Sequence, residues 1–246
     1  MSQQQAVADD TRSDVSMHLH TYDSPTQWAW GAAVALSARL QQTLDDKPRA
    51  RLLLSGGSTP GPVYSALAKA PLEWSRVDVG LVDERWLQPD DQDSNARLVR
   101  ESLLRHKAAA ARLETLTQAG RGIEEAVAVA NMRARTPADV VVLGMGEDGH
   151  TASLFPRMIG LAQALSTAVS YVAVDASGCA GAGRWLRRIS LTPAGLGPAQ
   201  SRMLLIRGAG KRALLEKIVA GGDPLEYPVR IALLTPGAPL HVHWCP

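Results

Sequence analysis

Residues 140–156 constrain the fold of this chain more than any other stretch. They open with Val-Val-Val-Leu, a run that is too short for a helix and too apolar for an exposed edge, which predicts a strand buried inside a sheet. Three glycines follow within six residues, and the stretch continues through Asp148 and His150 to Pro156. Ligands of α/β proteins bind beyond the carboxyl ends of parallel strands, so we expect the functional site at this turn.

Strand and helix patterns alternate along the rest of the chain. Short apolar or alternating runs predict strands at 51–54, 77–82, 171–174, 188–192, 201–206 and 229–234, with a possible short one at 241–244. Helical spacing and helix-start signals predict helices at 27–44, 94–106, 123–135 and 212–219, and one that ends near residue 68. This order predicts an α/β fold with a mainly parallel sheet and helices on both faces. We expect residues 15–246 to form a single α/β domain after a polar, disordered lead at 1–14.

Charge, hydropathy and cysteine content exclude several classes of protein. A net charge of +2, without a basic run interleaved with aromatics, argues against a nucleic-acid partner. No run of about 18 apolar residues is present, so we expect no membrane span, and the polar start does not resemble a signal peptide. Cys179 and Cys245 form neither a CxxC nor a zinc pattern, which favours a cytoplasmic protein. We expect a monomer that binds a small molecule.

The segment Ser-Gly-Gly-Ser-Thr-Pro at 55–60 lies between a predicted strand and a predicted helix. Glycines let the backbone turn sharply and present successive amides to an anion. The segment is not a Walker loop, because no Gly-Lys-Ser/Thr follows, and Pro60 stands where a nucleophile elbow needs a glycine. A plain strand–helix turn is the alternative to a phosphate cradle. The candidate phosphate-binding residues are Ser55, Gly56, Gly57, Ser58 and Thr59.

Further polar residues are expected at the same edge of the sheet. Asp83-Glu84-Arg85 ends the 77–82 strand, where an acid and a base could hold sugar hydroxyls or a developing oxyanion, or form only a surface ion pair. Asn95 follows Ser94 at a helix start, and the two could equally be an N-cap. Lys211 comes after Gly208-Ala-Gly at a strand end, so it could reach a phosphate or be a solvated first-turn lysine.

Asp148 and His150 lie two residues apart in the glycine-rich turn. Imidazole transfers protons near neutral pH and a carboxylate can orient it, so we interpret His150 as the centre of an active site. The turn also reads Gly-x-Gly-x-x-Gly from residue 144, which is a dinucleotide-binding pattern. Against that alternative, Asp148 would place negative charge beside a pyrophosphate, and Pro156 would break the required helix within about two turns.

Two other histidine pairs, His18 with His20 and His241 with His243, are spaced to share one face of a strand. This spacing superficially resembles metal ligation. No third ligand accompanies either pair, so we interpret them as two exposed strand faces and expect no metal site.

Taken in order, these motifs resemble the 6-phosphogluconolactonases of the glucosamine-6-phosphate isomerase/6-phosphogluconolactonase family. The resemblance spans about residues 24–235, and its most specific part is Asp-Gly-His-Thr-Ala-Ser-Leu-Phe-Pro at 148–156. It also rests on the motifs at 55–60, 83–85 and 94–95, on Arg-Ile-Ser-Leu-Thr at 188–192 and on Gly-x-x-Lys at 208–211. The chain departs from the family at Arg157, where glycine is frequent, and at 178–185, which replaces a Lys-Pro-Pro-type segment.

The resemblance implies a Rossmann-like α/β fold and an enzyme of the pentose phosphate pathway that needs neither a metal nor an organic cofactor. Its implied reaction is hydrolysis of 6-phospho-D-glucono-1,5-lactone to 6-phosphogluconate. A sugar-phosphate isomerase or deaminase is the rival, but similar deaminases carry a glutamate shortly after Asp-Gly-His, where Ser153-Leu-Phe-Pro156 offers no carboxylate. A non-catalytic sugar-phosphate-binding protein would need a partner segment for which this chain has no spare length.

We hypothesise that His150, oriented by Asp148, activates the attacking water, and that Arg85, held by Asp83, stabilises the oxyanion. The phosphate would lie on the 55–59 amides. The remaining residues expected to contact the substrate are Asn95, Gly146, Arg188 and Lys211, of which Lys211 and Arg188 would act as counter-charges to the phosphate.

Overall fold

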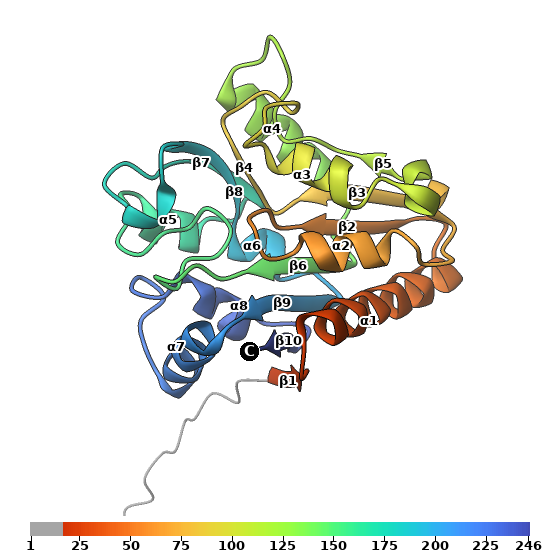
Figure 1. Ribbon diagram of the computed structural model, residues 1–246. Coiled ribbons are helices and arrows are strands. Elements are labelled where there is room, and N and C mark those ends of the chain that lie inside the picture. The colour runs from red at the N-terminus through yellow and green to blue at the C-terminus, as the bar shows by residue number, and fades with distance from the viewer. Residues whose placement is uncertain (1–16) are drawn as a thin grey trace, which may run out of the picture.

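The computed structural model of the protein describes residues 17–246, so the predicted lead at 1–14 lies outside the described residues. A seven-stranded sheet has the order β1-β10-β9-β6-β2-β3-β5, and all of its neighbouring strands run parallel (Figure 1). This confirms the predicted mainly parallel sheet. Its strands are β1 (Met17–Thr21), β2 (Ala50–Leu54), β3 (Val77–Leu81), β5 (Arg112–Leu113), β6 (Val140–Gly144), β9 (Ser201–Arg207) and β10 (Leu240–Cys245).

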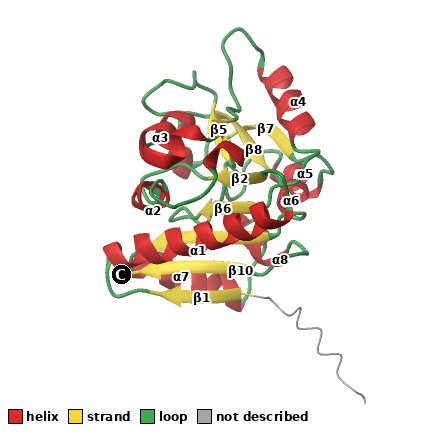
Figure 2. Ribbon diagram, turned by 90° about the vertical axis from the view of Figure 1, so that its right-hand side faces the viewer, coloured by secondary structure: helices red, strands yellow, loops and turns green. Residues whose placement is uncertain are grey.

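Helices cover both faces of this sheet, as predicted. Figure 2 shows α2 and α3 on one side of the column of strands and α6 and α8 on the other. The α-helices are α1 (Pro25–Asp46), α2 (Gly61–Leu67), α3 (Asn95–Ser102), α4 (Ile123–Arg133), α5 (Leu161–Ser166), α6 (Pro193–Leu196), α7 (Ala209–Ala220) and α8 (Ile231–Leu234). Single 3₁₀ turns are η1 (Trp74–Arg76), η2 (His106–Ala110), η3 (Ala180–Ala182) and η4 (Pro228–Arg230).

The central strands are the most apolar ones because they are enclosed on both faces. All five residues of β2 are buried, as are the three valines and the leucine of β6. Apolar side chains shielded by helices on both faces contribute about 25 cal/mol per Å² of buried area to folding. The central strands therefore form a rigid platform, and the turns at their carboxyl ends are held in fixed positions.

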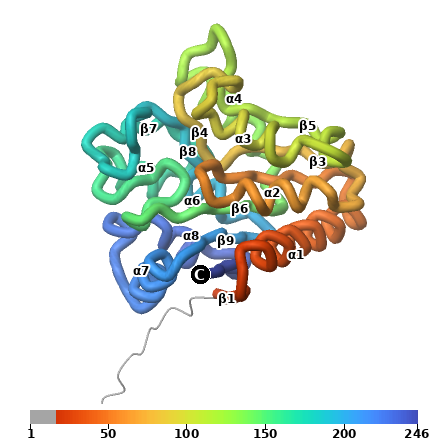
Figure 3. The backbone as a smooth tube through the Cα atoms, in the orientation of Figure 1, coloured from red at the N-terminus to blue at the C-terminus, as the bar shows by residue number. Residues whose placement is uncertain are grey.

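A second sheet, with the order β4-β8-β7, was not predicted. Its strands are β4 (Asp83–Arg85), β7 (Tyr171–Asp175) and β8 (Arg187–Leu191), and both of its pairings are antiparallel. In Figure 3 these three segments, far apart in sequence, lie side by side at one end of the molecule. Asp83-Glu84-Arg85 does not end the preceding strand, as the sequence suggested, but leaves the large sheet and pairs with β8.

Several predicted boundaries differ from the structure, and one predicted strand is wrong. Residues 229–234 form η4 and α8 instead of a strand. A short apolar run fits a buried helical turn as well as a strand, and Pro228 favours the first turn of a helix. The helix predicted at 94–106 ends at Ser102, and the one predicted from 212 begins at Ala209, so Lys211 lies inside its first turn.

The two histidine pairs lie on neighbouring strands at one edge of the large sheet. The possible strand at 241–244 is confirmed as β10, and it pairs in parallel with β1 so that His18 faces His241 and His20 faces His243. His18 is exposed, but His243 is only 1% exposed. The interpretation as two exposed strand faces is therefore wrong for His243.

Candidate active site

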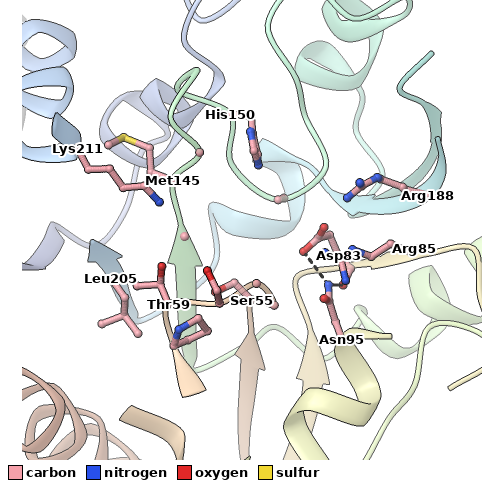
Figure 4. A pocket seen from close by; sticks show the side chains of 17 residues that line it. Ser55, Thr59, Asp83, Arg85, Asn95, Met145, His150, Arg188, Leu205 and Lys211 are labelled. Carbon is pink, nitrogen blue, oxygen red and sulfur yellow. Dashed lines mark hydrogen bonds between the residues drawn. The ribbon is translucent and has the colours of Figure 1, made fainter. Parts of the chain in front are cut away.

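One cavity of about 200 Å³ gathers nearly all of the predicted site residues (Figure 4). It lies where β2, β6 and β9 end and where the small sheet meets them. Of the predicted residues, only Asp148 is not in its lining. The lining residues are Ser55, Gly56, Gly57, Ser58, Thr59, Pro60, Asp83, Arg85, Asn95, Gly144, Met145, Gly146, His150, Ala152, Arg188, Leu205 and Lys211.

The 55–60 turn presents unpartnered donors to this cavity. Its start is fixed because Ser55 N donates to Val142 O and the buried Tyr64 hydroxyl donates to Ser55 O at 2.8 Å. The amides of residues 56–59 make no hydrogen bond within the described part of the chain, and neither does the buried Ser55 hydroxyl. A buried hydroxyl without a partner is unusual, and together with the free amides of a turn that follows a strand it indicates a site for an anionic ligand.

Lys211 approaches the same end of the cavity from the first turn of α7. In Figure 4 its side chain lies beside Met145, on the side of the pocket that holds Thr59 and Ser55. Burial lowers the pKa of the Lys211 ammonium, and the nearby carboxylates of Glu147 and Asp148 oppose that shift. A half-buried cation beside free amides is a favourable partner for a phosphate dianion.

Asp148 and His150 form the pair that the sequence predicted. The distance from His150 Nδ1 to Asp148 Oδ1 is 2.6 Å, and the Asp148 side chain also accepts from the His150 backbone amide at 3.1 Å. Burial alone would raise the pKa of Asp148, but the hydrogen bond and charge of His150 outweigh it and the pKa lies below its ordinary value. With Nδ1 occupied by a carboxylate, Nε2 is the ring nitrogen left for a substrate.

The turn between these residues is held by backbone contacts on both sides. Gly146 N donates to His150 O at 2.9 Å, and the Thr151 hydroxyl donates to Gly144 O at 2.8 Å. The His150 ring packs against Phe155, with the ring centroids 4.5 Å apart. These contacts fix the orientation of the imidazole before any ligand arrives.

Asp83 does not hold Arg85, so that part of the predicted arrangement is wrong. Asp83 accepts from the Ser153 hydroxyl at 2.5 Å, and its carbonyl accepts from Asn95 Nδ2 at 2.9 Å. The Arg85 guanidinium instead donates to the carbonyl of Asp93, and Arg85 Nε has no partner within residues 17–246. The structure therefore leaves one buried donor of Arg85 without a partner, in a residue that lines the cavity.

Arg188 lies with Arg85 and not with Lys211. The two arginines are register partners across β4 and β8, and Figure 4 shows both on the side of the pocket opposite Lys211. Arg188 is 6% exposed, and burial lowers the pKa of its guanidinium. It donates to the carbonyl oxygens of Trp185 at 2.8 Å and Ala182 at 2.5 Å. Most of its donors are therefore used to hold the chain around the pocket.

Sequence reasoning missed Glu84, whose carboxylate holds the start of α3 beside this side of the site. Its carboxylate is fully buried and accepts from the amides of Asn95 and Ala96 and from the Ser94 hydroxyl, each at 2.9 Å. It thereby satisfies the first donors of α3 and fixes Asn95 at the pocket. Met145 and Leu205 were also missed. Met145 could have been predicted as a lining residue because it lies inside the 144–156 motif. Nothing in the sequence around Leu205, on β9, indicates that it lines the cavity.

Two further findings concern the described residues as a whole. Among residues 17–246, no group of three or more His, Cys, Asp or Glu side chains is arranged to hold a metal ion. None of the helices in this range combines the length and apolar character that crossing a bilayer requires.

Comparison with known proteins adds independent information. Residues 23–244 match the family model described as glucosamine-6-phosphate isomerases/6-phosphogluconolactonase. The chain is 49% identical to a 6-phosphogluconolactonase of Xylella fastidiosa (strain Temecula1), over 95% of this chain and 98% of that protein. It is 39% identical to one of Rhizobium meliloti, over 94% of this chain and 100% of that protein. A crystal structure of a 6-phosphogluconolactonase from Shewanella baltica superimposes with a TM-score of 0.86 at 32% identity, covering 93% of this chain and 97% of the other.

Proposed function

Because this chain belongs to the glucosamine-6-phosphate isomerase/6-phosphogluconolactonase family, we propose that its cavity performs the lactonase reaction of that family. The protein is a hydrolase of the 6-phosphogluconolactonase type, and its reaction converts 6-phospho-D-glucono-1,5-lactone to 6-phosphogluconate in the pentose phosphate pathway. One observation carries the assignment of roles within the site: a carboxylate-paired imidazole and a cluster of unpartnered donors face the same cavity.

The phosphate binds at the end of the cavity that belongs to the large sheet. The free amides of residues 56–59 and the Lys211 ammonium surround it, and hydrogen bonds between charged groups are about twice as strong as neutral ones. Binding there sets the distance between the phosphate and the acyl carbon. The lactone carbonyl thus lies toward His150 and the small sheet.

His150 acts as the general base at the other end. Nε2 takes a proton from water while the water oxygen attacks C1, and the carbonyl oxygen becomes an oxyanion. When the bond from C1 to the ring oxygen breaks, the imidazolium returns the proton to that oxygen, which leaves as a hydroxyl. General base catalysis contributes about 10²–10⁴-fold, which suffices for an ester as reactive as a lactone.

Arg85 stabilises the oxyanion, and Asp83 and Asn95 hold the sugar hydroxyls. The donor of Arg85 that lacks a partner supports the first role. Arg188 belongs to the lactone end as the neighbour of Arg85, and not to the phosphate end, because its donors hold the carbonyls of Ala182 and Trp185.

Proton release after addition of freshly prepared lactone tests the reaction, because the carboxylic acid product ionises at pH 7. The protein must accelerate release well above spontaneous hydrolysis, while glucosamine 6-phosphate and ribose 5-phosphate must give no isomerised or deaminated product. Turnover of either control compound would support the isomerase or deaminase rival instead. Absence of any turnover would support a non-catalytic sugar-phosphate-binding protein.

Lys211→Ala tests the phosphate end. We expect KM to rise about 10–100-fold with a smaller change in kcat, because a hydrogen bond to a charged group is worth about 1.5–3 kcal/mol. Lys217→Ala is the matched control, since Lys217 is a solvent-facing lysine on the same helix that does not line the cavity. Glucono-1,5-lactone, which lacks the phosphate, must show no difference between the wild type and Lys211→Ala.

We also propose that the enzyme is a cytoplasmic monomer. Cys179 and Cys245 are both unpaired thiols, which suits a reducing compartment. Sedimentation at micromolar concentration tests the monomer, and a species of twice the chain mass would contradict it.

A further inference from the structure

The loop that joins β7 to β8, residues 176–186, packs against the back of the Asp148–His150 pair. A methyl group added at Gly181 would lie 2.5 Å from Asp148 Oδ2 and 3.2 Å from His150 Nδ1. Real side chains do not approach that closely, so a methyl group there would force the Asp148 carboxylate to move. Gly146 also lies against the pair, since a methyl group added there would overlap His150 Nδ1 and Asp148 Oδ1, so two glycine backbones contact the carboxylate and the imidazole.

Hydrogen bonds from Arg188 to loop carbonyls and from Trp185 to Asp93 hold this loop in place. Asp93 Oδ2 accepts from Trp185 Nε1 at 2.9 Å and pairs with the Arg184 guanidinium. These contacts hold the pKa of the Asp93 carboxyl below its ordinary value, with the hydrogen bond from Arg184 as the largest cause. The Arg184 side chain is 65% exposed, so its ion pair contributes little. The hydrogen bond from the indole of Trp185, a partly buried side chain, is less screened by solvent than the ion pair with Arg184.

Asp93 also holds the group proposed to stabilise the oxyanion. Its carbonyl oxygen accepts from the Arg85 guanidinium, and its amide is fixed by Asp91 Oδ1 at 2.9 Å. One residue between β4 and α3 therefore contacts Arg85 through its backbone and the 176–186 loop through its side chain.

We propose that Asp93 is a positioning residue for the lactonase reaction: through Trp185 it sets the loop whose Gly181 backs the Asp148–His150 pair, and through its carbonyl it sets Arg85. This inference rests on the proposed function of those groups. This role was not predictable from the sequence, because Asp93 and the 178–185 segment lie outside every motif recognised there.

The first test removes the hydrogen bond between Asp93 and Trp185. Asp93→Ala loses the acceptor for Trp185, and we expect kcat to fall about 10-fold with KM changed less than about 3-fold, because small misplacements of a catalytic group can cost up to about 10²-fold. Asp93→Asn keeps an oxygen acceptor and must recover most of the loss. Asp90→Ala, an exposed aspartate of the same segment whose side chain makes no hydrogen bond within residues 17–246, must behave as the wild type.

The second test addresses Gly181 directly. Gly181→Ala must lower kcat at least 10-fold and move the acid limb of the kcat/KM profile, since it displaces the carboxylate beside the imidazole. Gly178→Ala is the control in the same loop: an added methyl group there meets nothing within 4 Å, so its effect reports only the strain of a positive φ, which Gly181 does not have. In an Asp148→Ala background, the effect of Gly181→Ala must disappear, because the group through which it acts is gone.

The outcomes separate this inference from the proposed function. If the wild type hydrolyses the lactone but Asp93→Ala matches it in kcat, or Gly181→Ala matches Gly178→Ala, or the Gly181 and Asp148 effects add, the inference is overturned and the function stands. If the wild type has no lactonase activity, both fall. Should Asp93→Ala fail to fold, Trp185→Phe removes the indole N–H that Asp93 accepts, together with part of the ring, and an unchanged kcat in that variant overturns the proposal equally.

Discussion

Five of the six histidines lie in two settings that look alike in the sequence and differ in the structure. His150 lies two residues after Asp148 at the end of β6, and a carboxylate oxygen is 2.6 Å from its Nδ1. His18, His20, His241 and His243 form a column between β1 and β10, where successive rings stack with centroids 4.5–5.4 Å apart. His243 Nδ1 meets the Tyr22 hydroxyl at 2.8 Å, and His20 Nε2 meets His241 Nδ1 at 3.1 Å.

The difference teaches that the neighbours of a histidine decide its role. A carboxylate stabilises the imidazolium that forms during proton transfer, so the Asp148–His150 pair is suited to catalysis. Within residues 17–246, no carboxylate is a hydrogen-bond or stacking partner of the column. Burial, followed by the charges of His20 and His241, lowers the pKa of His243 to about 3. The His243 ring therefore stays neutral near pH 7, and the column serves the packing of β1 onto β10.

The largest expected effect is that of His150→Ala. Loss of the general base should lower kcat about 10²–10⁴-fold, with product affinity nearly unchanged because the phosphate end is intact. Steady-state proton release and a binding titration with 6-phosphogluconate measure the two quantities. Near-normal turnover would show that His150 has only a structural role, like the histidines between β1 and β10.

Asp148→Asn should have a smaller effect on the same reaction. The amide can still contact Nδ1, but it carries no charge to stabilise the imidazolium and can favour the wrong tautomer, so we expect kcat to fall about 10–100-fold. KM should remain within about 3-fold of the wild-type value. A variant with full activity would show that the carboxylate is dispensable and that the neighbouring charge does not distinguish the two settings.

Much of the contrast was accessible from sequence because its determinants are local. The apolar run of β6, the glycines after it and the spacing of Asp148 and His150 all lie within one short segment, and a core strand followed by a glycine turn has few alternative structures. The same holds for β2 and the 55–60 turn. In these parts the predicted strands and the positions of the residues around the cavity agree with the structure.

The parts that were missed depend on pairings between distant segments. Arg85 faces Arg188 only because β4 leaves the large sheet and joins β8, about a hundred positions later in the chain. Asp83 likewise accepts a hydrogen bond from Ser153, which is distant in the sequence. Nothing near Arg85 or Asp83 in the sequence encodes these partners, so the antiparallel sheet and the failure of Asp83 to hold Arg85 could not be foreseen.

His243→Gln should affect stability and leave turnover unchanged. The pKa of His243 in the folded protein, about 3, lies below the value of about 6.5 for an unfolded chain. The unfolded state therefore binds the proton more readily, so this contribution to stability is complete above pH 6.5 and is lost as the pH falls toward 3. The slope is about 1.4 kcal/mol per pH unit, or roughly 2 kcal/mol between pH 6.5 and 5.

Urea unfolding at pH 6.5 and pH 5 measures this slope. Glutamine can still bond to Tyr22 but cannot titrate, so the variant should lose less stability than the wild type over that interval. The other groups that face His243 are His20, His241 and Tyr22, and they remain in both proteins. Equal slopes for the wild type and His243→Gln would mean that the buried end of the column does not resist protonation.

The smallest expected effect is that of His18→Ala, at the exposed end of the column. His18 stacks on His241 with the centroids 5.0 Å apart, but its ring faces solvent on the other side, so truncation removes little buried area. Exposed substitutions usually change stability by less than about 0.5 kcal/mol, and we expect that here, with kcat unchanged. Because the four histidines differ mainly in burial, the unfolding free energies of the His18→Ala and His243→Gln variants should rank by exposure. A loss of more than about 2 kcal/mol for His18→Ala would show that stacking along the column, and not burial at its inner end, holds β1 to β10.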